Sequence, residues 1–331
     1  MRFLRILTIL LIPGFLLFSC KKELNLNTDW EDVTIVYGIL NQLDSAHYIK
    51  ITKAFLGPGN ALQYAQVADS SNYHLKLNVS LEAWSGSNLV AIYPFDTTTI
   101  DNKDSGVFYF PNQLLYVNDS TLSPSYTYKL VINNPETGKI ISSETKLVSS
   151  FLVSKPFAFQ SISYDAGKNS KLEWTSAYGG KRYQVLVRFF YREISLTDTS
   201  QHEMKSVDWL VIPGKLSSSD EGGEKIEVSY PNDGFYSMLS AQIQVNPDVE
   251  RVVPNNSIKY YFIVAGTDLN TYIEVSQPSS SIIQEKPTFS NIENGIGLFS
   301  SRFMQEIDSI NLSQRTIDEI RSNSLTKDLG F

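Results

Sequence analysis

The segment LSPSYTYKLVI, residues 122–132, joins a proline-containing turn to a strand in which apolar and polar residues alternate. Side chains along a β-strand point to opposite faces in turn, so this alternation indicates a strand with one buried and one solvated face. The run LKLNVSLEAW, residues 75–84, has the same period and ends in the turn-forming residues SGSN. Similar runs recur along most of the chain. We therefore expect an all-β fold.

The turn and strand at residues 122–132 resemble the tyrosine corner of immunoglobulin-like and fibronectin type III sandwiches. Residues 171–175 and 183–191 look like the B and C strands of a second such unit, with Trp174 in its core. Residues 258–266 would form its F strand and residues 271–276 its last strand. The resemblance implies two tandem immunoglobulin/fibronectin type III-like β-sandwiches, and the sequence adds a short C-terminal helix.

Shifts in composition divide the chain into five parts. The expected parts are a signal peptide (1–19), a flexible tether (20–31), a first β-sandwich (32–150), a second fibronectin type III-like sandwich (151–285) and a C-terminal tail (286–331). Residues 194–257 exceed what a minimal sandwich needs, so we expect an insertion that is functional or covers the sandwich, with a short helix at residues 235–243. In the tail, Ser313 is a typical N-cap for a helix over residues 314–323.

The N-terminus predicts where the protein resides. The basic residues of MRFLR precede an apolar run, residues 6–18, that is too short to span a bilayer but suits a signal peptide. The following LFSC, residues 17–20, resembles a bacterial lipobox, and Cys20 is the only cysteine in the chain. We expect lipidation of Cys20 and attachment to the membrane through that lipid. Lys21 at the next position favours the outer membrane, on either its periplasmic or its external face.

Composition excludes several classes of protein. The 331 residues include 28 basic and 35 acidic side chains, a formal charge of −7 that argues against a nucleic-acid partner held by phosphate contacts. An aromatic content of 12% excludes intrinsic disorder. A single cysteine excludes a disulfide framework and any multi-cysteine metal site.

No motif in the sequence points to catalysis. His47, His74 and His202 lack the spacing of a metal site, and there is neither a Gly-x-Ser-x-Gly elbow nor a glycine-rich phosphate loop. We therefore expect no catalytic residue, no metal and no cofactor.

Three features together look like one protein family. They are the lipobox, the strand pair VYGIL (36–40) and YIKI (48–51), and the segment NGIGLFSSR (294–302). The resemblance is to an uncharacterised family of Bacteroidota outer-membrane lipoproteins, often found beside TonB-dependent receptors, and it spans nearly the whole mature chain. It implies a cell-envelope role as an accessory to uptake, with a TonB-dependent receptor as partner. It implies no active-site residue and no substrate.

Aromatic residues near turns or in the expected insertion are candidates for contact with a partner. They are Tyr109, Phe110, Tyr116, Phe235 and Tyr236. The competing interpretation is that such rings fill the cores of the sandwiches. We expect a non-enzymatic, lipid-anchored binding or accessory protein. Two alternatives stay open: a surface hydrolase acting on a polymer, which needs clustered carboxylates or a Ser/His pair in a cleft, and a structural or adhesion protein, which needs a flat apolar patch.

Overall fold

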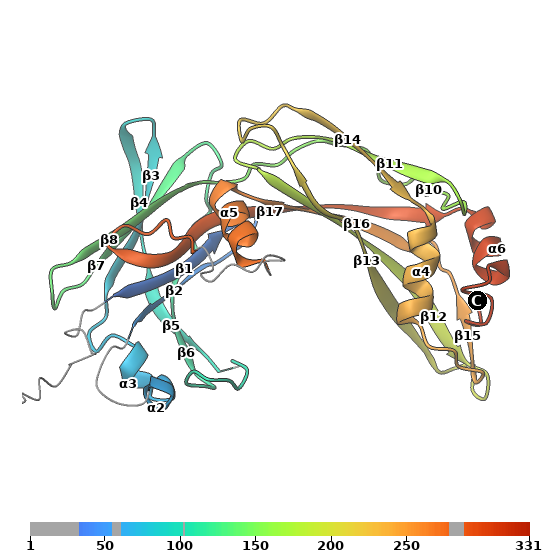
Figure 1. The fold of residues 1–331 in the computed structure, drawn as a ribbon, viewed down its shortest axis with the longest axis horizontal. Helices are drawn as coiled ribbons and strands as arrows, with labels where there is room; N and C mark the ends of the chain where they lie inside the picture. The colour runs from blue at the N-terminus through green and yellow to red at the C-terminus, as the bar shows by residue number, and fades with distance from the viewer. Residues whose placement is uncertain (1–32, 55–60, 102, 278–287) are drawn as a thin grey trace, which may run out of the picture.

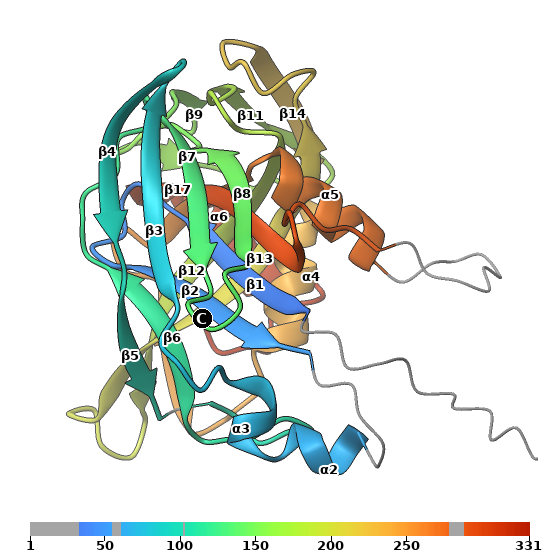
Figure 2. The ribbon, with the colours of Figure 1, turned by 90° about the vertical axis from the view of Figure 1, so that its left-hand side faces the viewer.

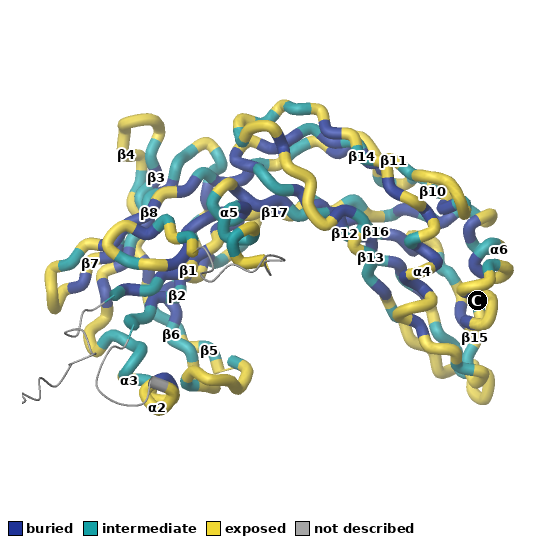
Figure 3. The backbone as a smooth tube through the Cα atoms, in the orientation of Figure 1, coloured by how far each residue is buried: buried dark blue, intermediate teal, exposed yellow. Residues whose placement is uncertain are grey.

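The computed structural model describes residues 33–54, 61–101, 103–277 and 288–331. Two β-sandwiches lie at opposite ends of the long axis and together form an arch (Figure 1). Buried residues gather between the sheets of each sandwich, which gives the molecule two separate hydrophobic cores (Figure 3). The expected all-β fold with two sandwiches and a short C-terminal helix is confirmed.

The first sandwich packs a four-stranded sheet against one part of a ten-stranded sheet (Figure 2). The four-stranded sheet has the order β4-β3-β7-β8 and consists of β3 (Asn78–Ser85), β4 (Asn88–Pro94), β7 (Thr127–Asn133) and β8 (Ile140–Lys146). The strands facing it include β1 (Thr34–Leu40), β2 (His47–Lys53), β5 (Asp96–Ile100) and β6 (Gln113–Asn118). Two short helices, α2 (Ala61–Ala65) and α3 (Ala68–Ser71), lie at one end.

The turn before β7 forms the expected tyrosine corner. The Tyr128 hydroxyl accepts a hydrogen bond from the Ser123 N–H at 2.8 Å and donates one to the Ser123 carbonyl at 3.0 Å. The Tyr128 side chain is fully buried. Burial raises the pKa of Tyr128 to about 12. The hydroxyl therefore pairs two backbone groups of the turn and ties that turn to the core.

The second sandwich packs the sheet β14-β11-β9 against the other part of the ten-stranded sheet. The smaller sheet consists of β9 (Val153–Lys155), β11 (Asn169–Thr175) and β14 (Lys225–Pro231). The larger sheet contributes β12 (Arg182–Ser195), β13 (His202–Leu216), β15 (Val249–Val252) and β16 (Ile258–Ala265). Trp174 on β11 is 1% exposed, so its expected place in this core is confirmed.

One long strand belongs to both sandwiches. β17 (Gly295–Leu312) pairs in parallel with β1 over its first seven residues, and from Arg302 onward it pairs antiparallel with β16. Phe299 therefore enters the first core and Phe303 the second. The expected tail over residues 286–331 is thus corrected, because this segment supplies the central strand of the ten-stranded sheet. The short β10 (Ser161–Ile162) also pairs with it.

A glycine lets β17 approach β1 closely. Gly297 has a φ of +127°, and a Cβ at this position would collide with the Val36 carbonyl group. Few residues other than glycine adopt such a backbone conformation. The NGIGLFSSR segment is therefore explained by strand packing where the two sandwiches meet.

The expected insertion over residues 194–257 is also corrected. β13 pairs with β12 along nearly its whole length, and β14 pairs with β11, so this segment supplies one edge strand to each sheet. Its helix, α4 (Asp233–Gln242), packs on β13 and agrees with the expected helix at residues 235–243. Sequence spacing could not show this for β14, because β12 and β13 lie between it and its partner β11 in the chain.

Two further helices precede and follow β17 in the chain. α5 (Thr267–Ser276) occupies the residues that the sequence predicted as a last strand, so that prediction is wrong. β17 takes the place of that strand in the sheet. α6 (Gln314–Ser322) begins at Ser313, whose hydroxyl accepts from the Thr316 N–H, and the predicted C-terminal helix and its N-cap are confirmed.

Candidate functional site

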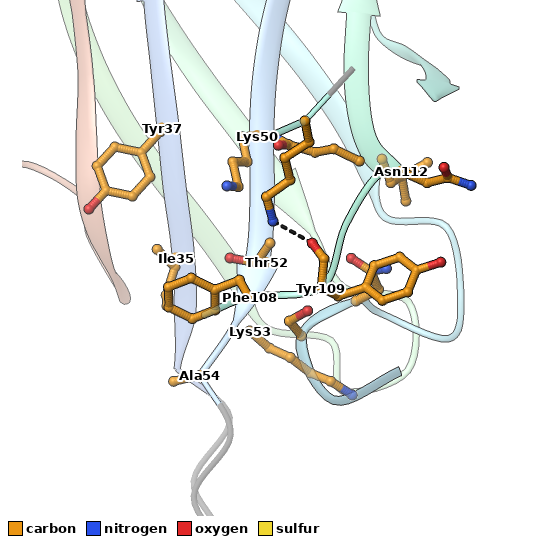
Figure 4. A pocket seen from close by; sticks show the side chains of 14 residues that line it. Ile35, Tyr37, Lys50, Thr52, Lys53, Ala54, Phe108, Tyr109 and Asn112 are labelled. Carbon is orange, nitrogen blue, oxygen red and sulfur yellow. Dashed lines mark hydrogen bonds between the residues drawn. The ribbon is translucent and has the colours of Figure 1, made fainter. Parts of the chain in front are cut away.

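A cavity of about 410 Å³ lies on the outer face of β1 and β2 in the first sandwich, near α3 (Figure 4). Its walls come from β1, β2 and residues 103–114, which follow β5 and enter β6. Small-molecule pockets usually measure roughly 300–1,000 Å³. The cavity is therefore large enough for a compound of one or two rings.

β1 and β2 place alternate side chains in the cavity. Tyr37 lies opposite Lys50 in the antiparallel register, and Ile35 lies opposite Thr52. All four line the cavity, whereas the intervening Val36 is buried in the sandwich core. The period of two along each strand therefore separates the side chains of the cavity from those of the core.

The loop between β5 and β6 is held in place by hydrogen bonds at its base. The Lys103 N–H donates to the Pro111 carbonyl at 3.2 Å, and the Lys103 ammonium donates to the Tyr109 carbonyl at 2.6 Å. The Tyr109 N–H donates to the Ala65 carbonyl of α2 at 2.8 Å. These bonds position Phe108 and Tyr109 at the wall of the cavity.

Three half-buried lysines give the cavity a positive charge. They are Lys50, Lys53 and Lys103, and the described residues that line the cavity include no carboxylate, histidine or cysteine. Burial lowers the pKa of Lys50, and the positive charge of Lys103 lowers it further. The cavity thus concentrates positive charge in a chain whose net charge is negative.

Aromatic rings lie beside two of the lysines. The Lys53 ammonium is 5.9 Å from the centroid of the Tyr73 ring, and the Lys103 ammonium is 5.9 Å from that of Phe108. Such cation–π contacts are favourable but leave the N–H donors of an ammonium group available. On the other side, the Tyr37 ring meets the edge of Tyr272 on α5, with centroids 6.5 Å apart.

Of the five aromatic residues expected to contact a partner, two lie at or beside the cavity and three are buried. Tyr109 lines the cavity, and the adjacent Phe110 is 42% exposed. Tyr116, Phe235 and Tyr236 are buried in the cores, so their expected role in binding a partner is corrected.

Hydrogen bonds and packing explain why these three rings are buried. The Tyr116 hydroxyl accepts from the Leu77 N–H at 3.0 Å inside the first sandwich. On α4, Tyr236 donates to the Tyr164 carbonyl, and the Phe235 ring packs in the second core. Burial raises the pKa of Tyr236. These rings have no surface to offer to a partner.

The lysines of the cavity were missed by the sequence analysis. Lys50 lies at a polar position of an alternating strand, a pattern that usually marks a solvated face. Lys103 is distant in the chain, and only the path of the loop after β5 brings it near Lys50. No motif connects the two, so only the tertiary structure reveals their proximity.

A second cavity, of about 400 Å³, lies where the two sandwiches meet. Lys146 in its wall forms an ion pair with Asp220 at 3.6 Å. The Asp268 carboxylate accepts from the Asn291 side-chain amide at 2.9 Å. Burial raises the pKa of Asp268, although the bond from Asn291 opposes the shift. The first contact joins β8 to the loop before β14, and the second joins α5 to the segment before β17. These polar residues therefore have a structural explanation.

A third cavity, of about 340 Å³, adjoins a charged cluster in the second sandwich. The Arg251 guanidinium donates to the Glu193 carboxylate at 2.8 Å and 3.0 Å, and Lys205 donates to the same carboxylate at 2.6 Å. Burial acts to raise the pKa of Glu193, but the two cations outweigh it and hold the pKa below its usual range. In this cluster, therefore, the cations are paired with a carboxylate.

The described part of the chain contains no cluster of metal ligands, and its buried histidine, His47, is bonded within the fold. His47 is buried, and its Nε2 lies 3.0 Å from the Ser120 carbonyl oxygen. Burial lowers the pKa of His47. No group of three or more His, Cys, Asp or Glu side chains that could hold a metal ion occurs among the described residues.

Cys20 and the whole signal and tether region lie outside the described residues. Within residues 33–54, 61–101, 103–277 and 288–331, no helix has the length and apolar character needed to cross a bilayer.

Comparisons with known proteins give no assignment. No family model and no curated protein matches this chain. The C-terminal globular domain of an oligosaccharyltransferase from Pyrococcus abyssi is 11% identical, with a TM-score of 0.24 over 70% of this chain and 47% of that chain. A chain from the complex of Dpr11 IG1 with DIP-gamma IG+IG2 is 8% identical, with a TM-score of 0.18 over 85% of this chain and 99% of that chain. Neither similarity bears on function.

Proposed function

We propose that this protein is a non-enzymatic, lipid-anchored binding protein of the bacterial outer membrane. The observation that carries the proposal is the cavity on the outer face of the first sandwich, where Lys50, Lys103 and Phe108 converge from elements distant in the chain. A pocket with an aromatic wall and a few convergent polar groups is the usual form of a small-molecule site.

The residues around this cavity favour binding over hydrolysis. A glycosidase requires two carboxylates, and a serine hydrolase requires a histidine beside its nucleophile. The described residues that line the cavity provide neither. The hydrolase alternative therefore receives less support than a binding role.

A thermal-unfolding screen of the full-length protein in detergent tests the binding role. The panel contains neutral monosaccharides, uronic acids, aromatic acids and amino acids. We expect at least one class to raise Tm, because a ligand that binds only the folded state stabilises it. Phe108→Ala should abolish the shift. Phe157→Ala is the matched control, since that ring is exposed to a similar extent, 59% against 57%, but lies in the second sandwich. No Tm change with any compound would contradict the proposal.

Attachment at Cys20 and the partner are tested separately. Labelled palmitate should mark the wild-type chain, and Cys20→Ala should remove the label and release the protein from membranes. If the protein is an accessory to uptake, a TonB-dependent receptor should co-purify with the wild-type chain from detergent-solubilised outer membranes. Retention of the label by Cys20→Ala would contradict the anchor, and absence of a receptor would contradict the accessory role.

A further inference from the structure

The ligand's charge can be inferred from the lysines of the cavity. The ammonium groups of Lys50 and Lys103 share the walls of a 410 Å³ space, and the described lining residues supply no carboxylate to neutralise them. Like charges held together without a counter-charge repel one another, and partial burial strengthens that repulsion. An anion placed between Lys50 and Lys103 would remove this cost.

The lysines are positioned without using up their hydrogen-bonding capacity. Lys103 donates to one carbonyl oxygen, that of Tyr109, and Lys53 lies over the Tyr73 ring. An ammonium group has three donors, so each of these side chains keeps donors for a ligand. Lys50 extends from the middle of β2, where its backbone is fixed by the register with β1.

The other residues of the cavity wall indicate the chemistry of the uncharged part of the ligand. Phe108 and Tyr37 present ring faces that are 57% and 43% exposed, and Ile35 adds an aliphatic surface. Asn72 and Asn112 provide amide donors and acceptors. A simple inorganic ion would leave the aromatic wall in contact with water, whereas a ring-shaped body would cover it.

We propose that the cavity binds an organic anion of one-ring size, with its carboxylate or phosphate group between Lys50 and Lys103 and its ring against Phe108. This inference rests on the proposed binding function and names the ligand class of the same site. Acidic sugars and aromatic acids share the required chemistry.

Matched pairs of compounds test the charge requirement. Isothermal titration of the full-length protein in detergent compares glucuronate with glucose, glucose 6-phosphate with glucose, and benzoate with benzyl alcohol. In at least one pair the anion should bind about ten-fold more tightly than its neutral counterpart, because a hydrogen bond to a charged group is stronger than one to a neutral group. The pair that responds distinguishes acidic sugars from aromatic acids. Salt should weaken binding of the anion.

Variants locate the effect in the cavity. Lys50→Gln and Lys103→Gln should each weaken binding of the anion about ten-fold and leave the neutral compound unaffected. Lys327→Gln is the matched control, because Lys327 is an exposed lysine near the C-terminus and outside the cavity. Circular dichroism verifies that all variants are folded.

Three outcomes would overturn the inference. If neutral compounds bind as tightly as the anions, the binding function stands and the inferred ligand class falls. If inorganic phosphate alone binds as tightly as the ring compounds, the aromatic wall has no part in recognition. If no member of any pair binds, both the inference and the proposed function lose their support.

Discussion

The two sandwiches differ in whether their partly buried cations are paired with a carboxylate. In the second, Arg251 and Lys205 share the carboxylate of Glu193, so the cluster is neutralised from within. In the first, Lys50 and Lys103 line a cavity whose described walls contain no carboxylate. The comparison teaches that the second cluster is neutralised within the fold, whereas the first keeps positive charge that no carboxylate of the described cavity wall neutralises.

The C-terminal residues close one end of the second core, whereas the cavity of the first sandwich lies outside its core. The C-terminal Phe331 packs against Phe189 and Tyr191 and fills one end of the second core. The backbone there is held as well, since the Arg251 N–H donates to the Gly330 carbonyl at 2.7 Å. The cavity of the first sandwich lies outside its core, on the outer face of β1 and β2 beside α3 and the loop after β5.

The largest expected effects come from the strand that the two sandwiches share. Phe299→Ala empties part of the first core and Phe303→Ala part of the second, and each should lower the free energy of unfolding by about 3–5 kcal/mol. If β17 couples the sandwiches, both variants should unfold in one transition by calorimetry. Two separate transitions, with only one shifted in each variant, would show that the sandwiches unfold independently.

Removing one cation from each cluster tests the charge comparison directly. Arg251→Met removes two of the three hydrogen bonds to the partly buried Glu193 carboxylate, leaves only that from Lys205, and should cost about 3 kcal/mol in urea denaturation. Lys50→Met should cost less than about 0.5 kcal/mol, because it also relieves repulsion from Lys103. Equal losses in the two variants would contradict the distinction between a structural and a ligand-binding cluster.

Tyrosine hydroxyls provide a smaller contrast. Tyr128→Phe leaves the Ser123 N–H and carbonyl without their partner and should cost about 1–2 kcal/mol. Tyr260→Phe should cost less, about 0.5–1 kcal/mol, because its partners are the hydroxyls of Tyr164 and Tyr230, which can reorient. Urea denaturation of both variants measures the difference, and a greater loss for Tyr260→Phe would reverse this ranking.

The smallest expected effect is a pH dependence confined to the first sandwich. Burial lowers the pKa of His47 in the folded chain, whereas the unfolded chain takes up a proton near pH 6.5. Stability should therefore be complete above pH 6.5 and decline as the pH falls below it. Denaturation at pH 7 and pH 5 should show a smaller decline in His47→Gln than in the wild type. The exposed His202→Gln serves as control, and an identical decline in both variants would exclude His47 as the source.

Local patterns in the sequence predicted many elements correctly. The tyrosine corner at Tyr128, the buried Trp174 and the C-terminal helix after Ser313 all depend on residues within a few positions of one another. The predicted strand over residues 271–276 failed because β-branched residues there suit a strand, while β17 occupies the place in the sheet. Competition between segments for one position cannot be seen in either segment alone.

By itself, the sequence determined the fold class and the period of most strands, because alternation reflects the two faces of each strand. Only the tertiary structure decided that Gly295–Leu312 joins both sheets and that Lys103 meets Lys50 beside an aromatic wall. The physical reason is distance along the chain. Pairing between remote strands and the path of a loop depend on how whole sheets pack, and no short-range pattern records that packing.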